Sequence, residues 1–142
     1  MALHIENVVI AKVYLTSAFN QRRHTRRLAE ALQELDYVVT SKWVNDIEVP
    51  VAMFDKGSAA VRNIMAISGS DIIVAVGPTV SRKVSFEMGY AHACGLRVMM
   101  VGGVTDPLHL YDMLPHQRFA TEEDFMVAMR KVSMFRFHKG EL

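Results

Sequence analysis

The strongest constraint on the fold is a regular alternation of apolar runs with amphipathic stretches. One run, Ile72 to Val76, contains only apolar residues and is followed by Gly77 and Pro78, which is typical of a buried strand in a parallel sheet. The stretch from Arg22 to Leu35 instead carries apolar residues at helical spacing, and Asp36 ends it. The alternating segments, in chain order, are 8–15, 22–35, 38–43, 58–67, 72–76, 85–94 and 96–101.

This order predicts consecutive βαβ units, and therefore an α/β domain in which helices cover both faces of a parallel sheet. Ser58 and Ser85 are predicted to cap the starts of two helices, and Gly95 the end of the second one. Thr121 and the acidic residues after it predict a last helix that ends near Met134. Segments 45–57 and 102–117 are predicted to be long connections, which often shape ligand sites.

The composition fits a single globular domain over residues 1–142. Hydrophobic residues make up 51% of the chain and charged residues 22%, which suffices for a full core. The formal net charge of +1 provides no general field for nucleic acid or a membrane surface, so neither partner is expected. No apolar run reaches membrane-spanning length. Because Cys94 is the single cysteine and no signal sequence is evident, we expect a reducing, cytoplasmic location.

The histidines do not indicate a metal site. There are six of them, and none fall at the close spacings that zinc sites favour. We therefore predict neither a metal nor a cofactor.

Glu87 is the first candidate for catalysis. It follows the strand from Ile72 to Val76 and lies in the predicted first turn of the helix that starts at Ser85. The partial positive charge of a helix N-terminus keeps a carboxylate ionised, which suits a nucleophile or an electrostatic stabiliser better than a proton donor. The alternative is a purely structural role, because acidic first-turn residues stabilise helices by roughly 0.3–1 kcal/mol.

Three segments of the chain resemble the nucleoside 2-deoxyribosyltransferase superfamily. These are Ala11 to Phe19, the pair Ser70-Asp71, and Phe86 to Ala91; the Glu-x-Gly-Tyr-Ala pattern in the last is the most specific mark. The superfamily also contains N-glycosidases that hydrolyse nucleoside 5′-monophosphates. The resemblance implies a Rossmann-like (flavodoxin-like) sheet, a small-molecule nucleoside or nucleotide as substrate, and a homo-oligomer, dimer or larger, in which a neighbouring subunit completes the site.

The resemblance assigns roles to two residues. For Glu87 it implies attack on C1′ of the sugar, which expels the base and leaves a glycosyl ester on the carboxylate. Water or a second base then resolves the ester. Tyr14 matches the family tyrosine that orients the nucleophile, although a strand aromatic can also simply pack on the sheet.

Two departures from the family pattern concern the substrate. Asn63 follows Arg62 where the family usually has an Asp that assists the leaving base. An amide can hydrogen-bond a base edge but cannot donate or accept a catalytic proton. The segment Ser81 to Ser85 replaces an acid or a glycine pair, and we include Ser85 among the candidate substrate contacts.

A cluster of basic residues lies at the start of the first predicted helix, where the helix dipole and mutual repulsion disfavour positive charge. A bound phosphate would offset that cost, held by Ser17, by backbone N–H groups after Phe19, and by Arg22 or Arg23. The alternative is a solvated basic face with acidic partners such as Glu30. The cluster consists of Arg22, Arg23, His24, Arg26 and Arg27.

Four further residues have less specific signals. Trp43 ends the second predicted strand and could stack on a base or sugar, although packing is the commoner role for such an aromatic. Arg82 and Lys83 precede Glu87 and could meet an anion or form a charged loop. Asp71 is expected to hydrogen-bond backbone at the start of the third strand.

Two functions from different classes follow from these observations. The first is cleavage of the N-glycosidic bond of a nucleoside or nucleoside 5′-monophosphate, with hydrolysis favoured over base exchange because a phosphate site fits the hydrolytic branch. The second is a non-catalytic nucleotide or nucleotide-sugar binding module, indicated by Asn63 and the missing glycine pair. A third, a flavodoxin-like electron carrier, lacks a recognisable flavin loop.

Overall fold

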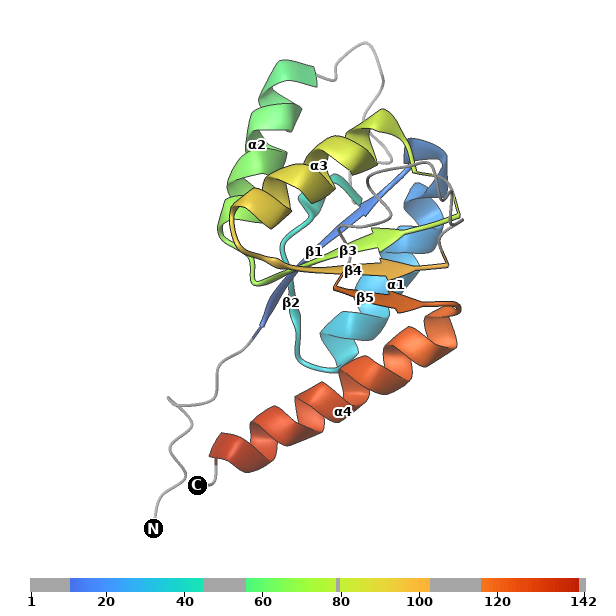
Figure 1. Ribbon diagram of the computed structural model, residues 1–142, viewed down its shortest axis with the longest axis vertical. Coiled ribbons are helices and arrows are strands. Elements are labelled where there is room, and N and C mark those ends of the chain that lie inside the picture. Colours follow the sequence, from blue (N-terminus) through green and yellow to red (C-terminus); the bar gives the residue numbers. More distant parts are fainter. Residues whose placement is uncertain (1–10, 45–55, 79, 103–115, 141–142) are drawn as a thin grey trace.

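The computed structural model describes residues 11–44, 56–78, 80–102 and 116–140 (Figure 1). Within these ranges one sheet of five parallel strands has the order β2-β1-β3-β4-β5. The strands are β1 (Lys12–Ser17), β2 (Val38–Val39), β3 (Ile72–Val76), β4 (Arg97–Val101) and β5 (Gln117–Phe119). The helices are α1 (Arg22–Glu34), α2 (Lys56–Ser68), α3 (Arg82–Ala93) and α4 (Glu122–Gly140), and the 3-10 turn η2 (Phe19–Gln21) precedes α1.

The helices form two layers, with α1 and α4 on one face of the sheet and α2 and α3 on the other (Figure 1). Successive strand residues point to opposite faces, so Val13 and Leu15 of β1 pack with Leu28 of α1 and Phe125 of α4, whereas Tyr14 lies in the core under α2 and α3. Full burial of each large apolar side chain contributes roughly 1.5–3 kcal/mol. The predicted α/β fold with helices on both faces is confirmed, and the strand order is that of flavodoxin-like sheets.

The strand order changes direction between β1 and β3, because β2 lies on one side of β1 and β3 on the other. In open α/β sheets, ligands bind outside the carboxyl ends of the strands at such a point. Ser17 and Val76 are paired there, as the last residues of their strands. This edge is therefore where the sheet is expected to hold a functional site.

Two local predictions are confirmed at element ends. Gly95 has a φ of 82°, its N–H donates to the carbonyl of His92, and the next N–H donates to the carbonyl of Ala91, both at 3.0 Å. This is a glycine-terminated helix end of the Schellman type. At the start of β3, Asp71 Oδ2 accepts a hydrogen bond of 2.8 Å from the backbone N–H of Lys12, so its structural role is as expected.

The predicted starts of two helices are wrong. α3 begins at Arg82, and its N-cap is Ser81, whose hydroxyl accepts from the Val84 N–H at 3.3 Å. Ser81 is as good a cap as Ser85 and adds a turn of backbone hydrogen bonds, including Ser85 N–H to Ser81 carbonyl at 3.0 Å. Glu87 therefore lies in the second turn of α3, where the helix dipole acts less strongly. Ser58 likewise lies inside α2 and does not cap it.

The C-terminal part of the chain follows the prediction with two differences. Thr121 Oγ1 accepts the Asp124 N–H at 3.1 Å and so caps α4, but α4 runs beyond Met134 to Gly140. The short strand β5, which begins at Gln117, is not predicted because its three residues form no apolar run. Residues 45–55 and 103–115, most of the two predicted connections, lie outside the described residues. No helix in the described part of the chain has the length and apolar character needed to cross a membrane.

Candidate active site

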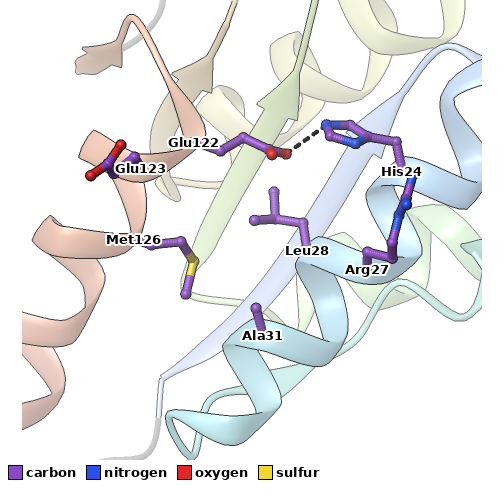
Figure 2. A pocket seen from close by; sticks show the side chains of 7 residues that line it. All are labelled: His24, Arg27, Leu28, Ala31, Glu122, Glu123 and Met126. Carbon is purple, nitrogen blue, oxygen red and sulfur yellow. Dashed lines mark ion pairs between the residues drawn. The ribbon is translucent and has the colours of Figure 1, made fainter.

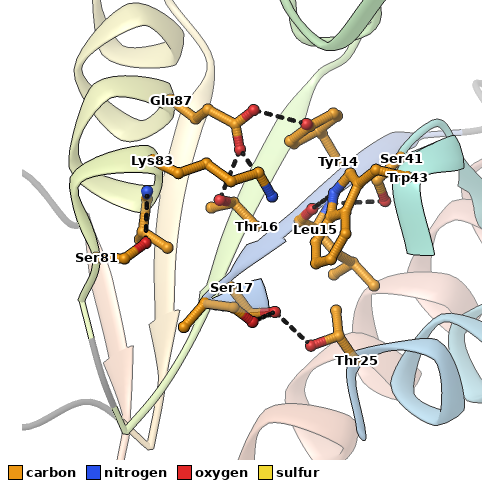
Figure 3. Close-up of polar contacts among 12 residues, drawn as sticks. Tyr14, Leu15, Thr16, Ser17, Thr25, Ser41, Trp43, Ser81, Lys83 and Glu87 are labelled. Atoms are coloured by element: carbon orange, nitrogen blue, oxygen red, sulfur yellow. Dashed lines mark hydrogen bonds and ion pairs between the residues drawn. The ribbon is translucent and has the colours of Figure 1, made fainter. Parts of the chain in front are cut away.

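A buried carboxylate lies between β1 and α3, close to the carboxyl edge of the sheet (Figure 3). Glu87 is only 3% exposed. The Tyr14 hydroxyl donates to its Oε2 and the Thr16 hydroxyl donates to its Oε1, both at 2.8 Å. Positions 14 and 16 of a strand point to the same face, so β1 presents both donors to α3. Each carboxylate oxygen is thereby held by one hydroxyl.

The phenol of Tyr14 acts as a neutral donor in this arrangement. Burial is the main cause that raises the pKa of Tyr14 far above its usual value, and the negative charge of Glu87 raises it further. The phenol therefore keeps its proton at neutral pH and donates a hydrogen bond to the carboxylate. The predicted proximity of Tyr14 to Glu87 is confirmed, and its fully buried ring also packs in the core as the alternative proposed. Its catalytic role stays a prediction.

Lys83, one helical turn before Glu87, is a third group at the carboxylate. Its Nζ lies 3.7 Å from Glu87 Oε1 and 3.5 Å from the centroid of the Trp43 ring. The Nζ atom is buried and makes no hydrogen bond with any residue that the structure describes. Burial lowers the pKa of Lys83, and the charge of Glu87 opposes that shift. Electrostatic attraction and the aromatic face, rather than hydrogen bonds, hold the ammonium group here.

Trp43 is attached to β1 through its indole. The Nε1–H donates to the carbonyl of Leu15 at 2.8 Å, and Ser41 Oγ accepts from the N–H of Leu15 at 3.0 Å. Within the segment from Val38 to Trp43, only Val38 and Val39 pair with β1 as a strand. The prediction that this strand continues to Trp43 is wrong, because two side chains replace the strand as partners of the Leu15 backbone.

A cavity of about 600 Å³ lies beside Trp43, between the segment that contains β2 and helix α2. It brings together two predicted substrate contacts, Trp43 and the half-buried Asn63. Since Lys83 contacts the same indole ring, Trp43 links this cavity to the carboxylate. The other lining residues are Val38, Val39, Thr40, Lys42, Arg62, Met65 and Ala66.

The predicted phosphate site after β1 is only partly available. The Ser17 hydroxyl is buried and hydrogen-bonds with Thr25 Oγ1 at 2.7 Å. The N–H groups of Gln21 and Arg22 donate to the carbonyls of Ala18 and Phe19. The expectation that backbone N–H groups after Phe19 face an anion is therefore wrong for these two, because the 3-10 turn already satisfies them.

The arginines and the histidine of the basic cluster divide into two groups. Arg22 lies over the exposed ring of Phe19 at 4.1 Å, and Arg23 is exposed; their phosphate role stays a prediction. Arg26 instead pairs with Glu30 at 3.7 Å, as the alternative proposed. His24 Nε2 lies 2.6 Å from Oε1 of Glu122. This last pair borders a cavity of about 410 Å³ between α1 and α4 (Figure 2), lined also by Arg27, Leu28, Ala31, Glu123 and Met126.

Sequence reasoning does not single out Thr16 or the Lys83 contact. Thr16 could have been found from strand periodicity, because it lies two residues after Tyr14 on the same face. Lys83 could have been found from helix periodicity, because it lies four residues before Glu87, but the predicted helix began too late to include it. Ser85 is half-buried within α3, and its contact with a substrate stays a prediction. Among the described residues, no three His, Cys, Asp or Glu side chains could together hold a metal ion.

The sheet order and the carboxylate at its carboxyl edge define a flavodoxin-like α/β protein with an acidic candidate site. Solved structures with this fold include a CMP N-glycosidase, BcmB, from Clostridium botulinum, with 16% identity, a TM-score of 0.57, and coverage of 83% of this chain and 97% of that chain. A 2-deoxyribosyltransferase from the psychrotolerant bacterium Bacillus psychrosaccharolyticus has 23% identity, a TM-score of 0.67, and coverage of 82% and 90%. A conserved protein from Enterococcus faecalis V583 has 19% identity, a TM-score of 0.63, and coverage of 87% and 99%.

These similarities establish a shared fold. No family model and no curated protein sequence matches the chain. The fold implied by the sequence resemblance is confirmed, and the structural neighbours include proteins named as a CMP N-glycosidase and a 2-deoxyribosyltransferase.

Proposed function

We propose that this chain cleaves the N-glycosidic bond of a nucleoside or nucleoside 5′-monophosphate, with Glu87 as the nucleophile. The observation that carries the proposal is the buried carboxylate with a hydroxyl donor on each oxygen. The shared fold with a CMP N-glycosidase and a 2-deoxyribosyltransferase supports the same chemistry. We favour hydrolysis over base exchange, because Arg22 and Arg23, which follow β1, suit a substrate that carries a phosphate.

The two oxygens of Glu87 have different surroundings. Among the described residues, Oε1 accepts from Thr16 and lies near the Lys83 ammonium, whereas Oε2 accepts from Tyr14 alone. Oε2 therefore keeps more of its electron density free, and we assign it the attack on C1′. The C1′–N bond breaks, its electron pair leaves with the base, and a glycosyl ester forms on the carboxylate.

Ionised Glu87 also stabilises the positive charge that develops on the sugar in an oxocarbenium-like transition state. Water then attacks C1′, breaks the ester and restores the carboxylate, and the proton that the water loses neutralises the departed base. Asn63, in the cavity beside Trp43, hydrogen-bonds an edge of the base but supplies no proton.

The proposal includes a homo-oligomer, dimer or larger, in a cytoplasmic location. Exposed apolar side chains on the α2–α3 layer, Val61, Met65 and Phe86, offer a surface for contact with a second copy. Light scattering on the purified protein would test this part, because a monomer at micromolar concentration would contradict it.

Base release from a panel of substrates tests the activity. Ribonucleosides, 2′-deoxyribonucleosides and their 5′-monophosphates are incubated with the protein, with and without a second free base, and the released base is followed by chromatography. Glu87→Gln keeps the shape of the side chain but removes its charge, so it should lower the rate by about 10³-fold or more. Incorporation of the added base would indicate transfer, and its absence hydrolysis.

A binding module without turnover is the second candidate, favoured by Asn63 in place of a proton donor. It predicts that no substrate in the panel releases its base, while one of them stabilises the protein. The stabilisation should reach about 2.7 kcal/mol when the ligand concentration is about 100 times Kd. Release of base by the wild type that disappears in Glu87→Gln would exclude this candidate.

A further inference from the structure

Lys83 and Glu87 form a pair that is too long for a direct hydrogen bond. Their Nζ and Oε1 atoms lie 3.7 Å apart, whereas charge-assisted N–H···O bonds measure about 2.7–2.9 Å. The Nζ atom is nevertheless buried and has no hydrogen-bond partner within the described ranges of the chain. A buried ammonium group whose donors are unused is costly, so an acceptor placed next to it would relieve that cost.

Trp43 confines the ammonium group to this position. The Nζ lies 3.5 Å from the centroid of its ring, and the indole Nε1–H is tied to the backbone of Leu15. Figure 3 shows the Lys83 side chain reaching toward Glu87 from α3, with Thr16 on the strand beside them. The ammonium group of Lys83 thus lies between the face of the Trp43 ring and Oε1 of Glu87.

The 3.7 Å separation of Nζ and Oε1 suits a bridging hydroxyl group. An oxygen about 2.8 Å from each atom would accept a hydrogen bond from the ammonium and donate its own proton to the carboxylate. A phosphate or carbonyl oxygen has no proton to donate and would be repelled by Oε1. The ammonium group and the carboxylate oxygen together therefore select a group that is both an acceptor and a donor.

We propose that Lys83 and Oε1 of Glu87 together bind the 2′-hydroxyl of a ribose, which makes Lys83 a specificity-determining residue for ribonucleosides over 2′-deoxyribonucleosides. This inference rests on the proposed function. When Oε2 attacks C1′, the other oxygen of the same carboxylate lies nearest to the substituents of the neighbouring carbon, C2′. Hydrogen bonds to this hydroxyl strengthen in the transition state of glycoside cleavage, and a 2′-deoxy substrate leaves the ammonium without an acceptor.

Matched substrates that differ only at C2′ test the inference. The value of kcat/KM for base release is measured for a ribonucleoside 5′-monophosphate and its 2′-deoxy counterpart with the same base. The wild type should favour the ribo substrate by about tenfold or more. Lys83→Met should lose most of this preference, while Arg82→Met, the same change at the exposed neighbouring position of α3, should keep it. The readout is the ratio of the two kcat/KM values. An effect of the substitution on Glu87 that is the same for both substrates cancels in this ratio.

A wild type that does not discriminate, or that favours the 2′-deoxy substrate, would overturn the inference, as would a Lys83→Met protein that keeps the preference. If no substrate releases its base, the proposed function fails, and the same pairs are compared as ligands by thermal shift. The ribo ligand should then raise the Tm more than its 2′-deoxy partner in the wild type but not in Lys83→Met. Equal shifts in the wild type, or no shift with either sugar, would overturn the inference.

Discussion

Removal of the Tyr14 hydroxyl should destabilise the protein only while residue 87 is a carboxylate. The phenol donates to Glu87 Oε2 at 2.8 Å, and both side chains are buried. A hydrogen bond to a charged group contributes about 1.5–3 kcal/mol, and Tyr14→Phe leaves the carboxylate with a single hydroxyl donor, Thr16. Because phenylalanine keeps the ring and its packing, we expect the free energy of unfolding to fall by about 1.5–3 kcal/mol.

Urea unfolding of a double-mutant cycle measures this coupling. In a Glu87→Met background the acceptor is gone and the phenol is left buried without it, so Tyr14→Phe should have no cost or should stabilise the protein. The coupling energy between positions 14 and 87 should therefore be about 1.5 kcal/mol or more.

Tyr37→Phe is the matched control, because the Tyr37 hydroxyl donates to the carbonyl of Met129 at 2.6 Å in the core on the opposite face of the sheet. Its cost should be about 0.5–1.5 kcal/mol and should be the same with Glu87 or Met at position 87. A coupling energy below about 0.5 kcal/mol for Tyr14, or an equal coupling for Tyr37, would refute the reasoning.

Three further predictions concern backbone strain, the indole anchor and pH. Asp36 is exposed and has a φ of 68°, so Asp36→Gly should raise the free energy of unfolding by about 0.5–1 kcal/mol in urea; a loss of stability would contradict the strain. Trp43→Phe leaves the carbonyl of Leu15 without its indole donor and should cost about 1–3 kcal/mol by the same assay, whereas a cost near zero would contradict the anchoring role. Burial lowers the pKa of Lys83 below its ordinary value of 10.5. At pH values between the lowered pKa and 10.5, the unfolded state therefore binds more protons than the folded state. The stability of the wild type relative to Lys83→Met should therefore rise as the pH increases toward 10.5 in thermal unfolding, and a falling difference would contradict the shift.

The central elements of the fold could be predicted because their signals are local. The apolar run of β3 and the helical spacing in α1 each identify an element from its own residues. β2 and β5 have only two and three residues, so neighbouring segments determine them more than their own sequence does. The start of α3 was ambiguous for a different reason, since Ser81 and Ser85 are equivalent caps by residue type.

The contacts of the candidate site likewise divide into those that the sequence could predict and those that it could not. The resemblance to a family predicted that Tyr14 lies near Glu87. Strand periodicity could have added Thr16, which lies on the same face of the strand as Tyr14. The contact between Lys83 and Trp43 depends on where α3 lies relative to the segment after β2, and no local pattern encodes that arrangement. The Ser17 hydroxyl shows the reverse case, because a residue type suited to phosphate binding is instead used inside the protein.

Mass mapping of Glu87 during turnover tests the central claim most directly. A reaction with the best substrate is quenched in acid and digested with trypsin, which cuts after Lys83 and Arg97 and so yields a peptide of residues 84–97. We predict that this peptide gains the mass of one glycosyl group and that fragmentation assigns it to Glu87 rather than to Cys94 in the same peptide. A glycosyl group on another residue, or undiminished base release by Glu87→Gln, would contradict the claim.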